Sequence, residues 1–214
     1  MYQLVRSPGE FMEQKAGQPK IRTEVLTVLL VGFLGSLGAI YVTQEALAFT
    51  DSDTAQITAI GLALEPIFGA VVLWIGYTLG LHALARYFDG RGVLRRLLKT
   101  TAWALIPLGV GNLLRSGAVY VLYQGIDIAA VVEEGSDGGA VEAVAQAGAG
   151  EPLYLVGQIL LLLGVLGSGY LMVYAVQTAK DLDRKPAIRA VAVPLSVHVL
   201  YLLWTTVQAV GIAG

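Results

Sequence analysis

Two ionisable side chains, Glu65 and Arg115, lie deep inside long apolar runs of this 214-residue sequence. Counted from the ends of their runs near Thr54 and Asp127, both lie about 11–12 residues in, or roughly 17 Å at 1.5 Å per helical residue. An isolated charge in hydrocarbon costs several kcal/mol, so we expect the carboxylate and the guanidinium to form an ion pair between neighbouring antiparallel helices. Such a pair could fix the register of the helices or mark a solute or proton site. We favour the first role, because one pair without further ionisable groups is a poor relay.

The other polar side chains within apolar runs are more typical of hydrogen bonds between helices than of ligand sites. They are Asn112, Gln158, Ser168, His198 and Gln208. Ser168 and His198 fall at a similar depth, an arrangement that a hydrolase acting inside a membrane would use. However, Gly167-Ser168-Gly169 lacks the further glycine of the rhomboid pattern, since Leu166 stands two residues before the serine. The sequence has no Cys and only two His, so we expect no metal site and no cofactor.

These groups are positioned by helices that cross a membrane. Hydrophobic residues make up 56% of the chain, charged residues only 14%, and mean hydropathy is +0.67, which together indicate several membrane spans. We predict an all-α polytopic membrane protein in which a short amphipathic segment, residues 1–23, precedes a five-helix domain, residues 24–214. Pro66 and Pro107 lie inside two of the spans and predict kinks. The predicted spans lie near 25–47, 55–85, 97–123, 152–178 and 190–212.

Basic residues are confined to alternate loops of this layout. The N-terminal segment and the turns at 86–99 and 180–189 hold every Lys and Arg except Arg115, whereas the loops at 45–54 and 124–151 hold none. The positive-inside rule therefore predicts a multi-pass cell-membrane protein with a cytoplasmic N-terminus and an external C-terminus. The loop at 124–151 is rich in Gly, Ala and acidic residues, and we expect it to be mobile. The cations expected to contact lipid headgroups or a protein partner are Arg86, Arg91, Arg95, Arg96, Lys99, Lys180, Arg184, Lys185 and Arg189.

The N-terminal segment and the glycines give two further expectations. Ser7 followed by Pro8 and Glu10 predicts the start of a short helix, which we place on the bilayer surface, with packing on the helix bundle as the alternative. The first span has glycines at positions 32, 35 and 38, and the second has a Gly76–Gly80 pair. Because glycine lets helices approach closely in lipid, these faces predict helix packing or a homo-oligomer.

Four short segments carry a resemblance to a known family. They are RSPGEFMEQ at 6–14, DGRG at 89–92, VLRRLLK at 93–99 and WALIP at 103–107. In this order, and with five spans, they resemble the Yip1 domain family. The resemblance implies a cytoplasmic N-terminus and, from the eukaryotic members, a link to Rab GTPases and vesicle traffic between ER and Golgi. Those members have a longer N-terminal cytosolic region, and the Ala-, Gly- and Val-rich composition here suggests an archaeal or bacterial type of member.

The sequence therefore favours a non-enzymatic membrane protein that acts as a scaffold for membrane organisation, with trafficking-like roles implied by the resemblance. Its expected partners are membrane lipids and a protein partner or second copy, with no nucleic acid. The main alternative is a small solute or ion transporter or channel centred on Glu65 and Arg115. A remote alternative is an intramembrane hydrolase that uses Ser168 and His198.

Overall fold

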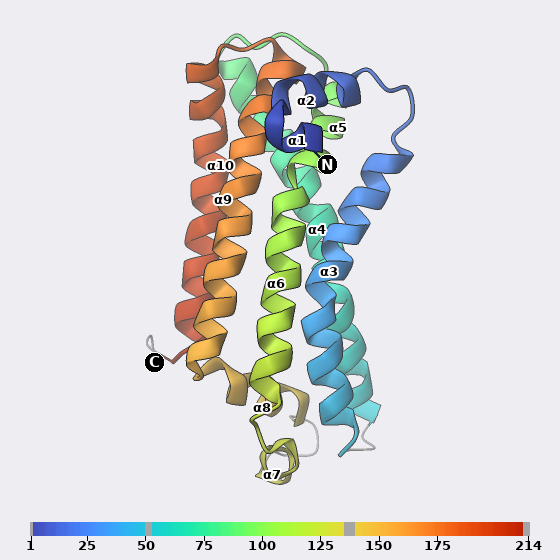
Figure 1. The fold of residues 1–214 in the computed structure, drawn as a ribbon, viewed down its shortest axis with the longest axis vertical. Helices are drawn as coiled ribbons and strands as arrows, with labels where there is room; N and C mark the ends of the chain where they lie inside the picture. The colour runs from blue at the N-terminus through green and yellow to red at the C-terminus, as the bar shows by residue number, and fades with distance from the viewer. Residues whose placement is uncertain (1, 50–52, 135–139, 212–214) are drawn as a thin grey trace.

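A computed structural model shows an all-helical protein (Figure 1) and describes residues 2–49, 53–134 and 140–211. Within these ranges, five segments are long and apolar enough to cross a membrane, which confirms the prediction of an all-α, five-span protein. The third is formed by two consecutive helices, and the predicted end of the fifth span at 212 lies outside the described residues. The spans are α3 (Arg22–Leu47), α4 (Asp53–Tyr87), α5 (Leu94–Ala104) with α6 (Ile106–Tyr123), α9 (Pro152–Lys180) and α10 (Arg184–Ala209).

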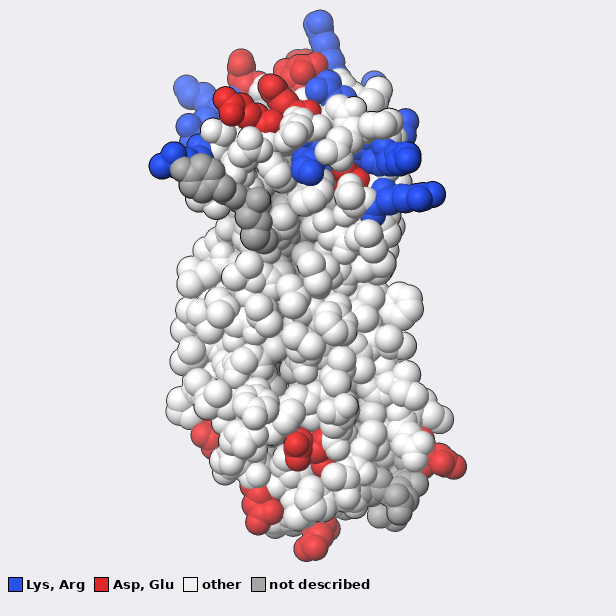
Figure 2. Space-filling model, turned by 45° about the vertical axis from the view of Figure 1, so that its right-hand side comes forward, with Lys and Arg blue, Asp and Glu red and all other residues white. Residues whose placement is uncertain are grey.

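The order of the spans in space differs from their order in the sequence. Helix α3 packs against both α4 and α6, α6 packs against α9, and α9 packs against α10 (Figure 1). The second and third spans, which are consecutive in the chain, are therefore joined mainly through α3 and through the contact of α4 with the short helix α5. Figure 2 shows a wide belt without charged side chains on one face, between an end with both Lys/Arg and Asp/Glu and an end with Asp/Glu. We call these the basic end, which holds residues 86–99 and 180–189, and the acidic end.

The third span is interrupted near its proline. Helix α5 ends at Ala104, Leu105 forms a turn, and α6 begins at Ile106 with Pro107 in its first turn. A helix start leaves backbone N–H groups without partners inside the helix. Here the N–H of Leu108 donates to Ser168 Oγ of α9 at 3.0 Å. At Pro107, where a kink was predicted, the span is interrupted, and at Pro66, where a kink was also predicted, α4 continues as one helix.

The N-terminal segment forms α1 (Tyr2–Arg6) and α2 (Pro8–Ala16), and α2 packs on α5 and α9. Its apolar side chains are buried in the protein: Met12 is fully buried, and the Phe11 ring meets the Trp103 ring edge to face at 5.5 Å. The preferred prediction of a helix lying on the bilayer is therefore wrong, and the alternative of packing on the bundle holds. Ser7 precedes the helix as predicted, but its side chain makes no capping hydrogen bond.

The connection at 124–151 is more structured than the mobile loop that composition predicts. It contains α7 (Ile128–Glu134) and α8 (Ala140–Ala149), while residues 135–139 lie outside the described part. Val141 and Val144 of α8 are fully buried beneath the acidic ends of α3 and α6, and Tyr123 donates a hydrogen bond to the Val144 carbonyl at 2.8 Å. The alanine and valine side chains of this acidic connection provide the apolar contacts that hold it against the bundle.

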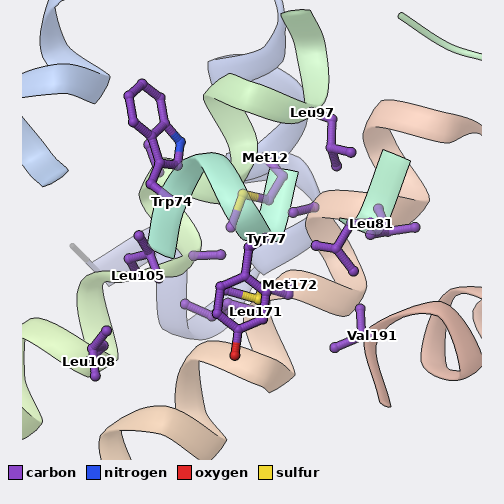
Figure 3. Packing of buried hydrophobic residues seen from close by; sticks show 14 of the residues in the cluster. Met12, Trp74, Tyr77, Leu81, Leu97, Leu105, Leu108, Leu171, Met172 and Val191 are labelled. Carbon is purple, nitrogen blue, oxygen red and sulfur yellow. The ribbon is translucent and has the colours of Figure 1, made fainter. Parts of the chain in front are cut away.

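The largest core cluster lies toward the basic end. Met12, Leu81, Leu97 and Met172 converge there from α2, α4, α5 and α9, and all four are fully buried (Figure 3). The lateral faces of the spans instead expose large apolar side chains such as Val72, which is 69% exposed. That distribution is expected of a bundle whose outer surface meets lipid tails.

Candidate functional site

Glu65 lies on the outward face of α4, where its side chain is exposed. It makes no hydrogen bond or ion pair with any residue that the structure describes. Gly61 and Gly69, one helical turn away on either side, also face open space: a β-carbon at either position would meet no atom within 4 Å. The carboxylate is therefore placed on the lipid-facing surface, outside the packed interior.

Arg115 points to a different neighbour. Its Cγ would lie 3.4 Å from a β-carbon at Gly157, so the side chain packs on α9. The two charged residues are nevertheless at similar depth, because a β-carbon at Gly35 of α3 would touch both Pro66, at 3.2 Å, and Asn112, at 3.0 Å. The depth of a residue in the membrane follows from its position in the sequence. The direction in which its side chain faces the other helices depends on which helices pack beside its own.

The predicted ion pair between Glu65 and Arg115 is thus not formed. Helix α3 packs between α4 and α6, and its glycines allow that close approach. A transporter or channel site centred on the pair loses its geometric basis, since one carboxylate faces outward from α4 and the guanidinium packs against α9.

Three of the polar side chains in the spans serve as hydrogen-bond partners between helices. Asn112 Nδ2 donates to the Val31 carbonyl of α3 at 3.2 Å. Ser116 Oγ donates to the Leu34 carbonyl and accepts from the Gly38 N–H, both at 3.1 Å, and so bridges a backbone pair four residues apart in α3. Ser168 caps α6 as described above. Each bond joins α6 to a neighbouring span.

The hydrolase hypothesis required Ser168 to lie beside His198, and the structure gives them separate partners. Ser168 Oγ accepts from the Leu108 N–H, whereas His198 Nδ1 lies 3.0 Å from the hydroxyl of Tyr77 on α4. The two side chains thus hold two different helix pairs together. Gln158 is buried on α9 and its Oε1 has no hydrogen-bond partner, while no hydrogen bond of Gln208 is found among the described residues.

Lys180, predicted to contact lipid headgroups, is instead fully buried at the end of α9. Its Nζ lies 2.5 Å from His82 Nδ1 and donates to the Gly92 carbonyl at 2.7 Å. The backbone reinforces the contact, because the Arg91 N–H donates to the Lys180 carbonyl at 2.8 Å. Gly92 is needed here: its φ is +20°, and a β-carbon would collide with the Ala179 carbonyl. Lys180 therefore joins the two turns of the basic end.

Two more of the predicted contact residues bind backbone carbonyls of the same chain. Lys99 is buried and its Nζ donates to the Gln18 carbonyl, while Arg95 donates to the Pro19 carbonyl at 2.6 Å. Both hold the linker between α2 and α3 against α5. The predicted contact residues whose side chains are exposed are Arg86, Arg91, Arg95, Arg184, Lys185 and Arg189, and Arg96 is half-buried.

Sequence reasoning missed Glu24, a fully buried carboxylate in the first turn of α3. Its oxygens accept from Trp103 Nε1 at 3.4 Å and from the Thr23 hydroxyl at 2.9 Å. Lys15 Nζ lies 4.1 Å from the centre of the Trp103 ring, a cation–π contact. A carboxylate such as Glu24 at the start of an apolar run is usually interpreted as the solvent-exposed end of a membrane span. The only sequence signal for its burial was Trp103 of the WALIP segment, whose indole N–H can donate a hydrogen bond to it.

A cleft of about 470 Å³ opens at the basic end between α2, α5 and α9. It is lined by Gly9 and by polar side chains of both charges: Glu13, Arg96, Tyr174, Gln177, Thr178 and Asp181. Asp181 adopts a left-handed backbone conformation with φ of 51° as it ends α9. The volume of the cleft falls within the range of small-molecule sites, although its lining is more polar than is usual for them.

The fold and these contacts define a polytopic α-helical membrane protein with a tightly tied basic end. Comparison with known families identifies which one: the Yip1 domain matches residues 2–206, nearly the whole chain. The chain belongs to the Yip1 domain family, which confirms the resemblance seen in the sequence. No curated protein and no solved structure matches it.

Proposed function

We propose that this Yip1-family protein is a non-enzymatic scaffold of the cell membrane that assembles with a second copy of itself through α4. All Lys and Arg residues except Arg115 cluster at one end of the bundle, which supports an orientation with a cytoplasmic N-terminus and an external C-terminus. The non-enzymatic role is supported by Ser168 and His198, the residues best suited to catalysis, because both are engaged in separate helix contacts.

The observation that carries the proposal is the outward face of α4. Glu65 stands there without a partner in the described structure, between Gly61 and Gly69 and in line with Gly76 and Gly80. A carboxyl group exposed to hydrocarbon costs several kcal/mol unless it is neutral or hydrogen-bonded. The glycines lower the surface beside it, so that another helix can approach closely enough to bury the group.

A second copy of this chain fits that face because the chemistry is self-complementary. A protonated carboxyl group is both donor and acceptor, so two Glu65 side chains related by a two-fold axis satisfy each other. The same axis places the glycine stripe of one α4 against that of its partner. The interface thereby removes the two exposed carboxyls from lipid together.

Cross-linking tests the proposal, and the natural absence of cysteine gives a clean background. In native membranes we expect Gly69→Cys to form disulfide-linked dimers, and Leu200→Cys on the exposed face of α10 to give few. Combining Glu65→Leu with Gly69→Cys should lower the yield of disulfide-linked dimer several-fold. Combining Glu65→Gln with Gly69→Cys should lower this yield less, because the amide keeps a hydrogen-bond donor and an acceptor.

Three results would overturn the proposal. One is equal cross-linking at positions 69 and 200, and another is a Glu65→Leu yield equal to that of the parent. The third is a cross-linked product whose mass shows a different protein bound at position 69.

A further inference from the structure

The cleft at the basic end has an unusual pattern of charge. Arg96 of α5 lines it together with two carboxylates, Glu13 of α2 and Asp181 at the end of α9. None of these three side chains makes a hydrogen bond or ion pair within the described chain. Gln177 and Thr178 add neutral donors and acceptors to the same wall. The cleft therefore presents unused groups for an anion and for a cation side by side.

A stripe along α9 connects this cleft to the lipid-facing surface. Leu163, Leu166 and Tyr170 are 59%, 45% and 54% exposed, and they are spaced by three and four residues, which places them on one helix face with Tyr174. The hydroxyls of Tyr170 and Tyr174 lie 3.0 Å apart, and Tyr174 lines the cleft. The polarity of the stripe thus increases from the leucines through the tyrosines to the charged cleft. A phospholipid shows the same order of polarity from its acyl chains to its headgroup.

We propose that the cleft binds the headgroup of a phospholipid that carries both a phosphate and a primary ammonium group, as in phosphatidylethanolamine. Arg96 binds the phosphate, because a guanidinium matches phosphate oxygens with two parallel donors. Glu13 and Asp181 bind the ammonium group, and an acyl chain lies along Leu163, Leu166 and Tyr170.

The two carboxylates decide the class of lipid. A headgroup with only negative charge would gain from Arg96 but would be repelled by Glu13 and Asp181, which line the same cleft. The exposed cations of the turns, such as Arg184 and Arg189, attract anionic lipids without this restriction. The cleft does not involve α4, so this site is independent of the proposed dimer.

Native mass spectrometry of the full-length protein in detergent, titrated with defined lipids, tests the site. We expect phosphatidylethanolamine to bind about tenfold more tightly than phosphatidylglycerol of the same acyl chains, a difference of about 1.4 kcal/mol. Arg96→Gln should remove the tight site, and the double variant Glu13→Gln, Asp181→Asn should reverse the preference toward phosphatidylglycerol. Arg189→Gln, with the same loss of charge at an exposed position, is the matched control and should keep the preference.

Several outcomes would overturn the assignment. Equal binding of the two lipids by the natural protein is one, and an equal loss in Arg96→Gln and Arg189→Gln is another. Free phosphoethanolamine should compete only at far higher concentration because it lacks acyl chains, so competition at equal concentration would exclude a lipid as the occupant. Glu65→Leu should bind phosphatidylethanolamine normally, which separates a failure of this site from a failure of the proposed dimer. Circular dichroism of each variant verifies that it is folded.

Discussion

Two helices of this bundle carry glycine faces, and the structure uses them in opposite ways. On α3, Gly32, Gly35 and Gly38 are closed in by α4 and α6, and a β-carbon at Gly32 would lie 2.6 Å from the Ile67 Cα. On α4, four glycines and Glu65 face open space. Small-residue spacing thus marks a surface that permits close approach, but it does not say whether the approaching helix belongs to the same chain.

The largest effect should come from filling the closed face. In Gly32→Ala the added methyl meets the backbone of α4, the Ile67 Cα at 2.6 Å and the Pro66 carbonyl at 2.9 Å, and neither can move without shifting the helix. We expect the free energy of unfolding to fall by about 1–3 kcal/mol. The measurement is reversible unfolding in mixed micelles, followed by helix content.

Gly69→Ala on the open face is the matched control for that substitution. Its methyl would meet no atom within 4 Å in a single copy. Alanine is the better helix former, by up to about 1 kcal/mol, so stability should stay level or rise. If both variants lose the same stability, the distinction between the two faces is mistaken.

A smaller effect should come from removing a hydrogen bond at the closed face. Ser116 links α6 to the backbone of α3 through Leu34 and Gly38, so Ser116→Ala removes both contacts. Hydrogen bonds between membrane helices contribute about 0.6 kcal/mol on average and up to about 1.7 kcal/mol, and we expect a loss in that range by the same unfolding assay. Thr58→Ala on α4 removes a half-buried hydroxyl that has no hydrogen bond in the described chain, and it should cost clearly less.

The same two faces show what sequence could and could not predict. Hydrophobic length gave the spans, and counting residues along the helices put Glu65 and Arg115 at similar depth, in agreement with the contacts that a β-carbon at Gly35 would make with both Pro66 and Asn112. It could not give the direction of Glu65 around α4, because that depends on α3 packing between α4 and α6. The spacing of residues in the sequence gives their position along the helix axis. Which helix packs against a given face depends on the arrangement of the whole bundle.

The basic end shows a second limit of the same kind. Charge counting grouped Lys180 and Lys99 with the exposed arginines of the turns. In the structure both lysines are buried and bound to backbone carbonyls, Lys180 to Gly92 and Lys99 to Gln18. A basic residue near a span end therefore predicts the side of the membrane better than it predicts what the side chain touches.

The smallest expected effect is also the sharpest test of the comparison. If Glu65 were paired with Arg115 inside the bundle, removing one partner of a buried ion pair would cost about 3–5 kcal/mol. Because Glu65 is exposed on α4 and unpaired within the described chain, Glu65→Gln should change the unfolding free energy of the monomer by less than about 0.5 kcal/mol. The measurement belongs at high detergent-to-protein ratio, where the proposed dimer is dissociated. A loss of several kcal/mol there would restore the internal ion pair and, with it, the transporter hypothesis, because the carboxylate would then have to face the interior of a single copy.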